Sequence, residues 1–196
     1  TVLRPGTEPS YLTTLDQRVD LIKQQGIELV ICLEFTLEMA QVPAAEFAKM
    51  LTDSLKMKGL VLGPDSALGK DRQGDLAFMR KQGEELGFWA SSVEPLEITG
   101  QPVKSRRIRD AVANGNLAVC PELLGRNHLL SGVVVVGDQR GRTLGFPTAN
   151  LDVDPQLLLP GDGIYATWAI IDGERHQAAT SIGTRPTFDL TQRLVE

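Results

Sequence analysis

Apolar positions in the first 125 residues follow two alternating patterns, one helical and one strand-like. The spacing predicts helices at about 14–25, 44–57 and 75–86, separated by apolar runs at 27–33, 60–62 and 88–93. The run IELVICL at 27–33 is almost continuously apolar, which is typical of a strand covered on both faces. Because helices and buried strands alternate, we expect a parallel sheet with helices packed on it.

Local signals mark the ends of the predicted helices. Thr14 and Gln17 have the spacing of a capping box at the first helix. Glycines are expected to end the three helices at Gly26, Gly59 and Gly87. Two shorter helices, SRRIRDAVANG at 105–115 and NLAVCPELLG at 116–125, follow, and Ser105 stands where it could cap the first of them.

From Leu129 onward the pattern becomes that of antiparallel β-structure. SGVVVVGD is followed by turn residues, a Pro-rich stretch and the β-rich segment at 162–182. Within that segment, Asp172 and Gly173 separate two β-rich runs and predict a tight hairpin. We therefore expect two domains, at 1–126 and 127–196.

Composition narrows the class of protein. A chain of 196 residues that is 42% hydrophobic and 23% charged can bury one sizeable core or two small ones. No apolar run reaches the roughly 20 residues that span a bilayer, and no secretory signal is visible, so we expect a cytoplasmic protein without membrane partners. The net charge of -5 argues against nucleic acid. We expect Cys32 and Cys120 to be reduced core thiols, and His128 and His176 to be structural or surface residues.

The glycine-containing loop GPDSALGK at 63–70 follows a predicted parallel strand. Five residues separate Gly63 from Gly69, and Asp71 follows Lys70, so the loop does not have the spacing of a Walker A motif. Ligands nevertheless bind at the carboxyl ends of strands in open α/β sheets. The loop is interpreted either as a ligand-binding edge or as an ordinary surface turn.

The segment VKSRRIRD places arginines in the first turn of a predicted helix. A helix N-terminus with arginines suits a polyphosphate. The same residues also fit a capped helix with a solvated basic face, and the residues alone leave both readings open.

The segment GRTLGFPTAN at 141–150 combines a glycine-rich turn with Thr148 and Asn150. In an extended chain these two side chains share a face. Their neutral oxygens could bind a magnesium ion together with phosphate oxygens, while glycine backbone N–H groups approach the phosphates. A plain β-turn with an Asn cap is the alternative.

Several segments, in order along both halves, resemble the bacterial bifunctional riboflavin kinase/FAD synthetases. The segments that resemble the kinase domain are GRTLGFPTANL, LPGDGIYA and SIGTRPTF, and those that resemble the adenylyltransferase half are LTTLDQRVDLI, FTLEMAQVPAAEF, GPDSALGKDRQGD and SRRIR. The resemblance implies a Rossmann-like nucleotidyltransferase sheet at 1–126. A partial antiparallel β-barrel of riboflavin kinase type would follow at 127–196.

The resemblance also implies the site residues and the chemistry. ATP would be bound by Gly141, Arg142, Gly145, Pro147, Thr148, Asn150, Ser105 and Arg109, and flavin by Asp65, Gly69, Lys70 and Arg72. Thr148 and Asn150 would hold Mg²⁺, and Glu196 would be the kinase base. The reactions would be phosphorylation of riboflavin to FMN and adenylylation of FMN to FAD, each with ATP. A non-catalytic flavin- or nucleotide-binding module is the alternative.

By the same resemblance, we expect the chain to be a fragment that lacks both ends of the family's domains. We expect it to be inactive by itself in both reactions, with Glu196 on a frayed strand. The sequence does not determine the oligomeric state.

Overall fold

The computed structural model describes residues 10–137, 145, 147–184 and 193–196. The chain divides into two compact units. One contains Ile31–Pro102, and the other contains Glu8–Val30 together with Val103–Glu196. From residue 10 onward, the described chain therefore starts in the second unit, passes through the first, and then returns to complete the second.

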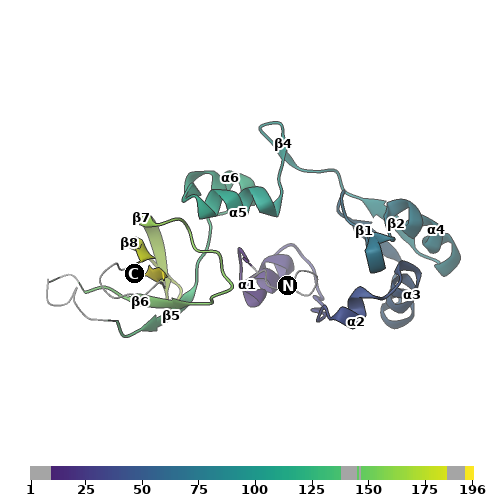
Figure 1. The fold of residues 1–196 in the computed structure, drawn as a ribbon, viewed down its shortest axis with the longest axis horizontal. Helices are drawn as coiled ribbons and strands as arrows, with labels where there is room; N and C mark the ends of the chain where they lie inside the picture. The colour runs from purple at the N-terminus through teal and green to yellow at the C-terminus, as the bar shows by residue number, and fades with distance from the viewer. Residues whose placement is uncertain (1–9, 138–144, 146, 185–192) are drawn as a thin grey trace. The chain divides into compact units, whose positions relative to one another are not determined.

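The first unit is a small α/β unit with a parallel strand pair. Its elements are α2 (Leu37–Ala40), α3 (Ala44–Leu55), β1 (Gly59–Leu62), the 3₁₀ turn η1 (Lys70–Arg72), α4 (Leu76–Leu86), β2 (Trp89–Ser92), β3 (Glu97–Ile98) and β4 (Gln101–Pro102). β1 and β2 pair in parallel, with Gly59 opposite Trp89 (Figure 1). The predicted parallel sheet is confirmed for these strands.

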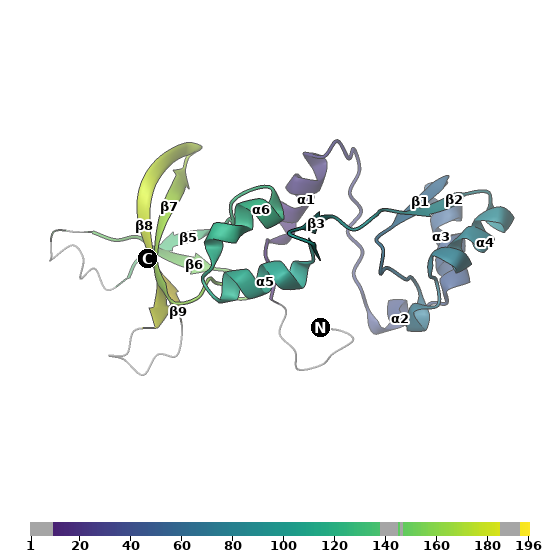
Figure 2. The same cartoon turned by 90° about the horizontal axis from the view of Figure 1, so that it is seen from above.

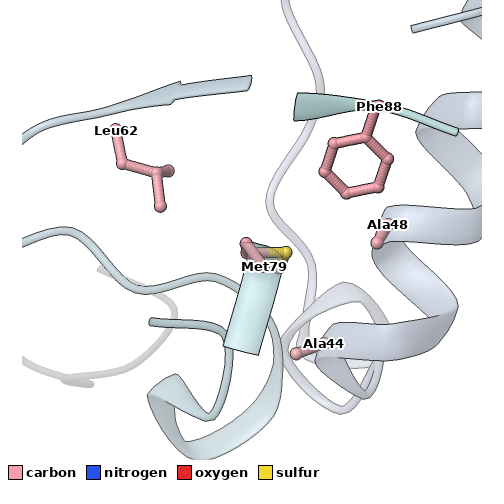
Figure 3. Packing of buried hydrophobic residues seen from close by; sticks show 5 residues of the cluster. All are labelled: Ala44, Ala48, Leu62, Met79 and Phe88. Carbon is pink, nitrogen blue, oxygen red and sulfur yellow. The ribbon is translucent and has the colours of Figure 1, made fainter. Parts of the chain in front are cut away.

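The core of the first unit forms where α3 and α4 meet the strands. Its buried side chains are Ala44, Ala48, Leu62, Met79 and Phe88, which face a common interior in Figure 3. The two alanines on α3 let the helices approach closely, and the fully buried Met79 of α4 fills the space between them. Asp75 caps α4 by accepting from the Phe78 N–H at 2.8 Å. The predicted stop at Gly87, which is left-handed, is confirmed.

Three predictions for residues 27–59 are wrong. The run at 27–33 is not a strand, and most of its apolar side chains are exposed, with Leu29 at 72%. A strand needs a neighbour for its backbone N–H and C=O groups, and none of the described strands pairs with this run. Cys32 lies in the same run and is exposed, so only Cys120 is a core thiol. The helix predicted to run to Gly59 ends at Leu55, because Lys56 is left-handed.

The second unit combines short helices with an antiparallel sheet (Figure 2). Its elements are α1 (Leu15–Lys23), α5 (Ser105–Ala113), η2 (Leu117–Val119), α6 (Cys120–Leu124), β5 (Gly132–Val135), β6 (Asn150–Val153), β7 (Gly163–Ile171), β8 (Glu174–Thr184) and β9 (Arg193–Val195). The strand order is β5-β6-β9-β8-β7. The described strands form an open sheet that matches the predicted antiparallel class.

Two local predictions in this unit are confirmed. Thr14 and Gln17 form the capping box of α1, with side-chain-to-backbone bonds of 3.2 and 3.0 Å. Asp172 and Gly173 connect β7 to β8 in a tight hairpin, with φ of 51° and 85°. Positive φ at both central residues is the geometry that matches the twist of paired strands.

Backbone hydrogen bonds join the segment before α1, and helix α5, to the loop that precedes β7. The Tyr11 N–H donates to the Gln156 carbonyl, and the Leu158 N–H donates to the Tyr11 carbonyl, both at 2.8 Å. The Gly161 N–H donates to the Val112 carbonyl of α5 at 3.1 Å. These backbone bonds join segments more than 45 residues apart in sequence into one unit.

In the part of the chain that the structure describes, no helix has the length and apolar character needed to cross a bilayer.

Candidate functional site

The central strands of the sheet bring Asn150 and Glu196 together. Leu151 of β6 pairs with Val195 of β9, and the Val135–Asn150 pair joins β5 to β6. The strands are antiparallel, so one step along the register places Asn150 opposite Glu196. Residues directly opposite each other in a sheet project from the same face. The two side chains, 46 positions apart in sequence, are therefore neighbours.

The type of pairing brings these side chains closer still. The Glu196 N–H donates to the Ser181 carbonyl at 2.9 Å, and the Ser181 N–H donates to the Glu196 carbonyl at 2.8 Å. Both backbone groups of Glu196 thus point toward β8. On its other side Glu196 meets Asn150 in the non-hydrogen-bonded type of pair, in which side chains are closer than in the hydrogen-bonded type. The expectation of a frayed strand at Glu196 is wrong, because the backbone is paired.

Gly137 packs closely against the side-chain amide of Asn150. A Cβ on Gly137 would stand 2.6 Å from Asn150 Cγ and 2.8 Å from its Oδ1. The amide therefore occupies space that any other residue at 137 would fill. Gly137 lies two residues after the end of β5, the neighbour of β6 in the sheet. Its close approach therefore limits where the side chain of Asn150, the first residue of β6, can lie. Sequence analysis missed this glycine, although its position directly after VVVV was a usable signal.

The segment before Asn150 leads straight into β6. Pro147 and Thr148 are exposed, and Gly145 adopts a φ of 84°, as a turn residue in this stretch requires. Gly141 and Arg142 lie outside the described residues. The shared face predicted for Thr148 and Asn150 stays a prediction, because residues 147–149 precede the strand.

The donor set fits a hard cation with few protein ligands. Asn150 offers an amide oxygen and Thr148 a hydroxyl oxygen, both of the kind that Mg²⁺ accepts. The described residues contain no cluster of three or more His, Cys, Asp or Glu side chains able to hold a metal. A site built here would thus rely on phosphate oxygens and water for its remaining ligands.

The loop after β1 forms a second candidate region. It leaves the carboxyl end of a parallel strand, as predicted, and closes through mutual backbone bonds between Leu68 and Gly74 of 3.0 and 2.9 Å. Gly69 packs on α3, since a Cβ there would lie 2.5 Å from Ala44 Cα. The Lys70 N–H donates to the Val42 carbonyl at 2.7 Å. The loop is thereby anchored to the N-terminal end of α3.

Arg72 holds the two ends of this loop together. Its guanidinium donates to the Asp65 carbonyl at 2.6 Å, and both Asp71 and Arg72 have positive φ, at 52° and 58°. Non-glycine residues rarely adopt this conformation, and it recurs at functional sites. Asp65 and Arg72 are exposed, while Gly69 and Lys70 are half-buried. All four predicted flavin-binding residues thus belong to one anchored loop.

Helix α5 forms the third candidate region. Ile108 and Val112 are buried, so one side of the helix packs on the rest of the second unit. Arg109 is half-buried, whereas Ser105 and Arg106 are exposed. The prediction that Ser105 caps this helix is wrong. Lys104 is the N-cap, no side-chain cap bond forms there, and Ser105 is the first helical residue.

The three regions are divided between the units. The loop at 63–74 belongs to the first unit, while α5 and the Asn150–Glu196 pair belong to the second. Within the second unit lies a pocket of about 280 Å³ between β6, β9 and the loop that follows β6. It is lined by Leu151, Asp152, Val153, Asp154, Pro155, Leu157, Leu159, Arg193, Leu194 and Val195.

His128 is a half-buried histidine of the second unit. Burial lowers its pKa, and the nearby positive charge of Arg126 lowers it further. Among the described residues neither ring nitrogen has a hydrogen-bond partner. His128 is therefore neutral near pH 7 and structural, as expected. Burial likewise raises the pKa of the Cys120 thiol, which keeps it protonated and unreactive.

Two family models match the two halves of the chain, and known relatives align with nearly all of it. A model for FAD synthetase matches residues 1–107, and one for riboflavin kinase matches residues 124–196. A bifunctional riboflavin kinase/FMN adenylyltransferase of Escherichia coli (strain K12) is 36% identical over 181 residues, which cover 91% of this chain and 58% of that protein. The protein of the same name from Bacillus subtilis (strain 168) is 33% identical over 190 residues, covering 95% and 59% respectively.

A solved structure shares the fold over nearly the whole chain. The crystal structure titled macrolide-efflux protein from Streptococcus pneumoniae matches with a TM-score of 0.88 and 29% identity, covering 99% of this chain and 63% of that one.

The chain belongs to the FAD synthetase family and carries in addition a region of the riboflavin kinase family. It spans about 58% of the length of the curated relatives with which it aligns.

Proposed function

We propose that the protein containing this chain makes FMN and then FAD. It would transfer a phosphoryl group from ATP to the 5′-hydroxyl of riboflavin, and then AMP from a second ATP to FMN with release of pyrophosphate. The substrates are small molecules, and the expected cytoplasmic location accords with them. The family matches support both steps, and the domain ranges 1–126 and 127–196 stay our proposal for where each activity resides.

The observation that carries the kinase proposal is the pairing of Asn150 with Glu196. A kinase needs a carboxylate that accepts the proton of the attacking hydroxyl, close to the groups that position the phosphates. The register that puts Glu196 beside Asn150 on adjacent strands supports this assignment. Glu196 would accept the 5′-hydroxyl proton as the oxygen attacks the γ-phosphorus, and Asn150 would lie beside it.

The same residues would take part in binding the metal. When bound, Mg²⁺ would neutralise phosphate charge in the transition state. Asn150 and Thr148 would hold it through their side-chain oxygens, and Gly137 would keep the Asn150 amide in place from below. Glycine backbone N–H groups of the 141–145 turn and Arg142 would bind the phosphates, with Pro147 stiffening the exit from that turn.

Adenylylation would use the other two regions. The anchored loop with Asp65, Gly69, Lys70 and Arg72 would receive flavin, because it lies at the carboxyl end of a parallel strand. Ser105 and Arg109 would bind ATP phosphates at the start of α5, where N–H groups and the helix dipole favour negative charge. Positioning and charge stabilisation, without a covalent intermediate, would drive this step.

The test is a pair of substitutions in the gene product that contains this chain. Asn150→Ala or Thr148→Ala is expected to abolish conversion of riboflavin to FMN with ATP and Mg²⁺, while adenylylation of supplied FMN continues. Asn127→Ala, at an exposed asparagine before the sheet, is the matched control and should leave both activities unchanged. Normal kinase turnover of either site variant at limiting Mg²⁺ would contradict the metal role. Absence of both activities in the parent would favour a non-catalytic flavin-binding module.

A further inference from the structure

Arg193, the first residue of β9, is fixed at the end of the strand that leads to Glu196. Its Nε donates to Asp162 Oδ1 at 2.8 Å, and its Nη2 lies 2.6 Å from the same oxygen. The Nη2 group also donates to the Pro160 carbonyl. Two guanidinium nitrogens and three contacts hold this side chain far more tightly than a single surface ion pair would.

The turn at 160–162, which Arg193 contacts, is also held by contacts with α5 and Tyr165. The Gly161 N–H donates to the Val112 carbonyl at 3.1 Å, and a Cβ on Gly161 would lie 2.9 Å from the Ala113 carbonyl oxygen. The Tyr165 hydroxyl donates to the Gly161 carbonyl at 2.5 Å. The turn is therefore wedged against the end of α5, and Arg193 binds a fixed point.

This anchor matters because β9 is short. It has three residues, which pair with Ile182, Gly183 and Thr184 of β8, whereas a single pair, Leu151 with Val195, joins it to β6. A shift of one residue in register moves every side chain of a strand to the opposite face. For Glu196 such a shift would turn its carboxylate away from Asn150. The pairs with β8 set the register of β9, and a contact at its first residue adds to them at the strand end that lies farthest from Glu196.

We propose that Arg193 is a positioning residue for phosphorylation of riboflavin, an inference that rests on the proposed kinase function. By binding Asp162 and the Pro160 carbonyl, Arg193 adds to the contacts that hold the register of β9 and so keeps Glu196 opposite Asn150. Arg193 and Glu196 are three residues apart and project from opposite faces of the strand. Arg193 therefore acts through the backbone and does not touch the substrate.

The experiment compares Arg193→Gln, Arg193→Lys and Asp162→Asn with the parent gene product. In Arg193→Gln we expect the kcat for riboflavin phosphorylation to fall by about 10- to 100-fold, because small misplacements of a reacting group are costly. The KM values for riboflavin and ATP should stay within about twofold, as the substrate contacts remain. Arg193→Lys should recover part of the loss, since one ammonium can still reach the Asp162 carboxylate.

A second measurement does not depend on activity. Amide hydrogen exchange at Ser181 and Glu196, which bond to each other, should be faster in Arg193→Gln and Asp162→Asn. Lys49→Gln is the matched control, because it breaks an exposed ion pair of 2.8 Å in the first unit and should change neither exchange nor kcat.

The outcomes separate the two proposals. If the parent does not phosphorylate riboflavin, the proposed kinase function fails, and the exchange data alone decide whether Arg193 fixes β9. Unchanged exchange at Ser181 and Glu196 in both variants would overturn the positioning role. So would a kcat equal to that of the parent, or a loss confined to KM, in a parent that is an active kinase.

Discussion

Gly137→Ala offers a sharp test of the candidate kinase site, because it adds one methyl group directly against Asn150. The new Cβ would stand 2.2 Å from Asn150 Nδ2 and 2.6 Å from its Cγ, whereas ordinary contacts begin at 3.4 Å, so the amide must retreat by about 1.2 Å. The clashing atoms belong to the end of a side chain, and Gly137 does not have a positive φ. The amide is therefore expected to rotate away while the backbone stays in place.

We expect Gly137→Ala to lower kinase turnover strongly and to change the free energy of unfolding little. A misplacement of about 1 Å at a reacting site lowers turnover by about 100-fold, or about 2.7 kcal/mol of transition-state stabilisation. The free energy of unfolding should change by no more than about 0.5 kcal/mol, as at a position without a buried backbone clash. The assay is riboflavin phosphorylation at limiting Mg²⁺, with adenylylation of FMN in the same preparation as the internal control. Parental kinase turnover in a folded Gly137→Ala protein would show that Asn150 is not a ligand.

Three further predictions concern other parts of the chain. Met79→Ala, at a fully buried position, should lower the free energy of unfolding of the first unit by about 2–5 kcal/mol, measured by denaturant titration. A loss below about 1 kcal/mol would contradict the packing of Met79 described above. Because burial lowers the pKa of His128, the unfolded chain binds more protons than the folded one below about pH 6.5, so stability should fall as the pH drops through that range. His128→Leu should flatten this dependence in thermal melts, and an unchanged dependence in that variant would contradict the role of His128. Arg109→Ala should slow the formation of FAD from FMN, with a loss of about 2.7–4 kcal/mol of transition-state stabilisation by analogy with the loss of one preorganised donor. The formation of FMN should stay unchanged. FAD formation at the parental rate would contradict a role for Arg109 in binding ATP.

Helix caps, helix ends and tight turns were predictable where a few neighbouring residues determine the backbone conformation. The capping box of Thr14 and Gln17, the stop at Gly87 and the Asp172–Gly173 hairpin were all evident in the sequence, because each depends on φ preferences or side-chain bonds within a few residues. The parallel pairing of β1 with β2 was also predictable, from the alternation of apolar runs with helices.

Features that depend on partners far along the chain were not predictable. The run at 27–33 has the composition of a buried strand, but composition does not provide a neighbour, and its side chains are exposed. The roles of Gly137 and Arg193 depend on the register of β5, β6 and β9, which no local pattern specifies. The candidate site residues stay predictions from the sequence, whereas the contacts around Asn150, Glu196 and Arg193 came only from the structure.

The return of the chain to its starting unit affects how the sheet can be isolated. Residues 127–196 expressed alone would lack Tyr11 and Val112, which bond to the backbone of Gln156 and Gly161. Those backbone groups would then face solvent, and the turn that receives Arg193 would lose its support from α5. Conversely, residues 31–102 are joined to the rest of the chain by two covalent connections, in the manner of an inserted domain, so a single proteolytic cut at either connection would leave the two units tethered.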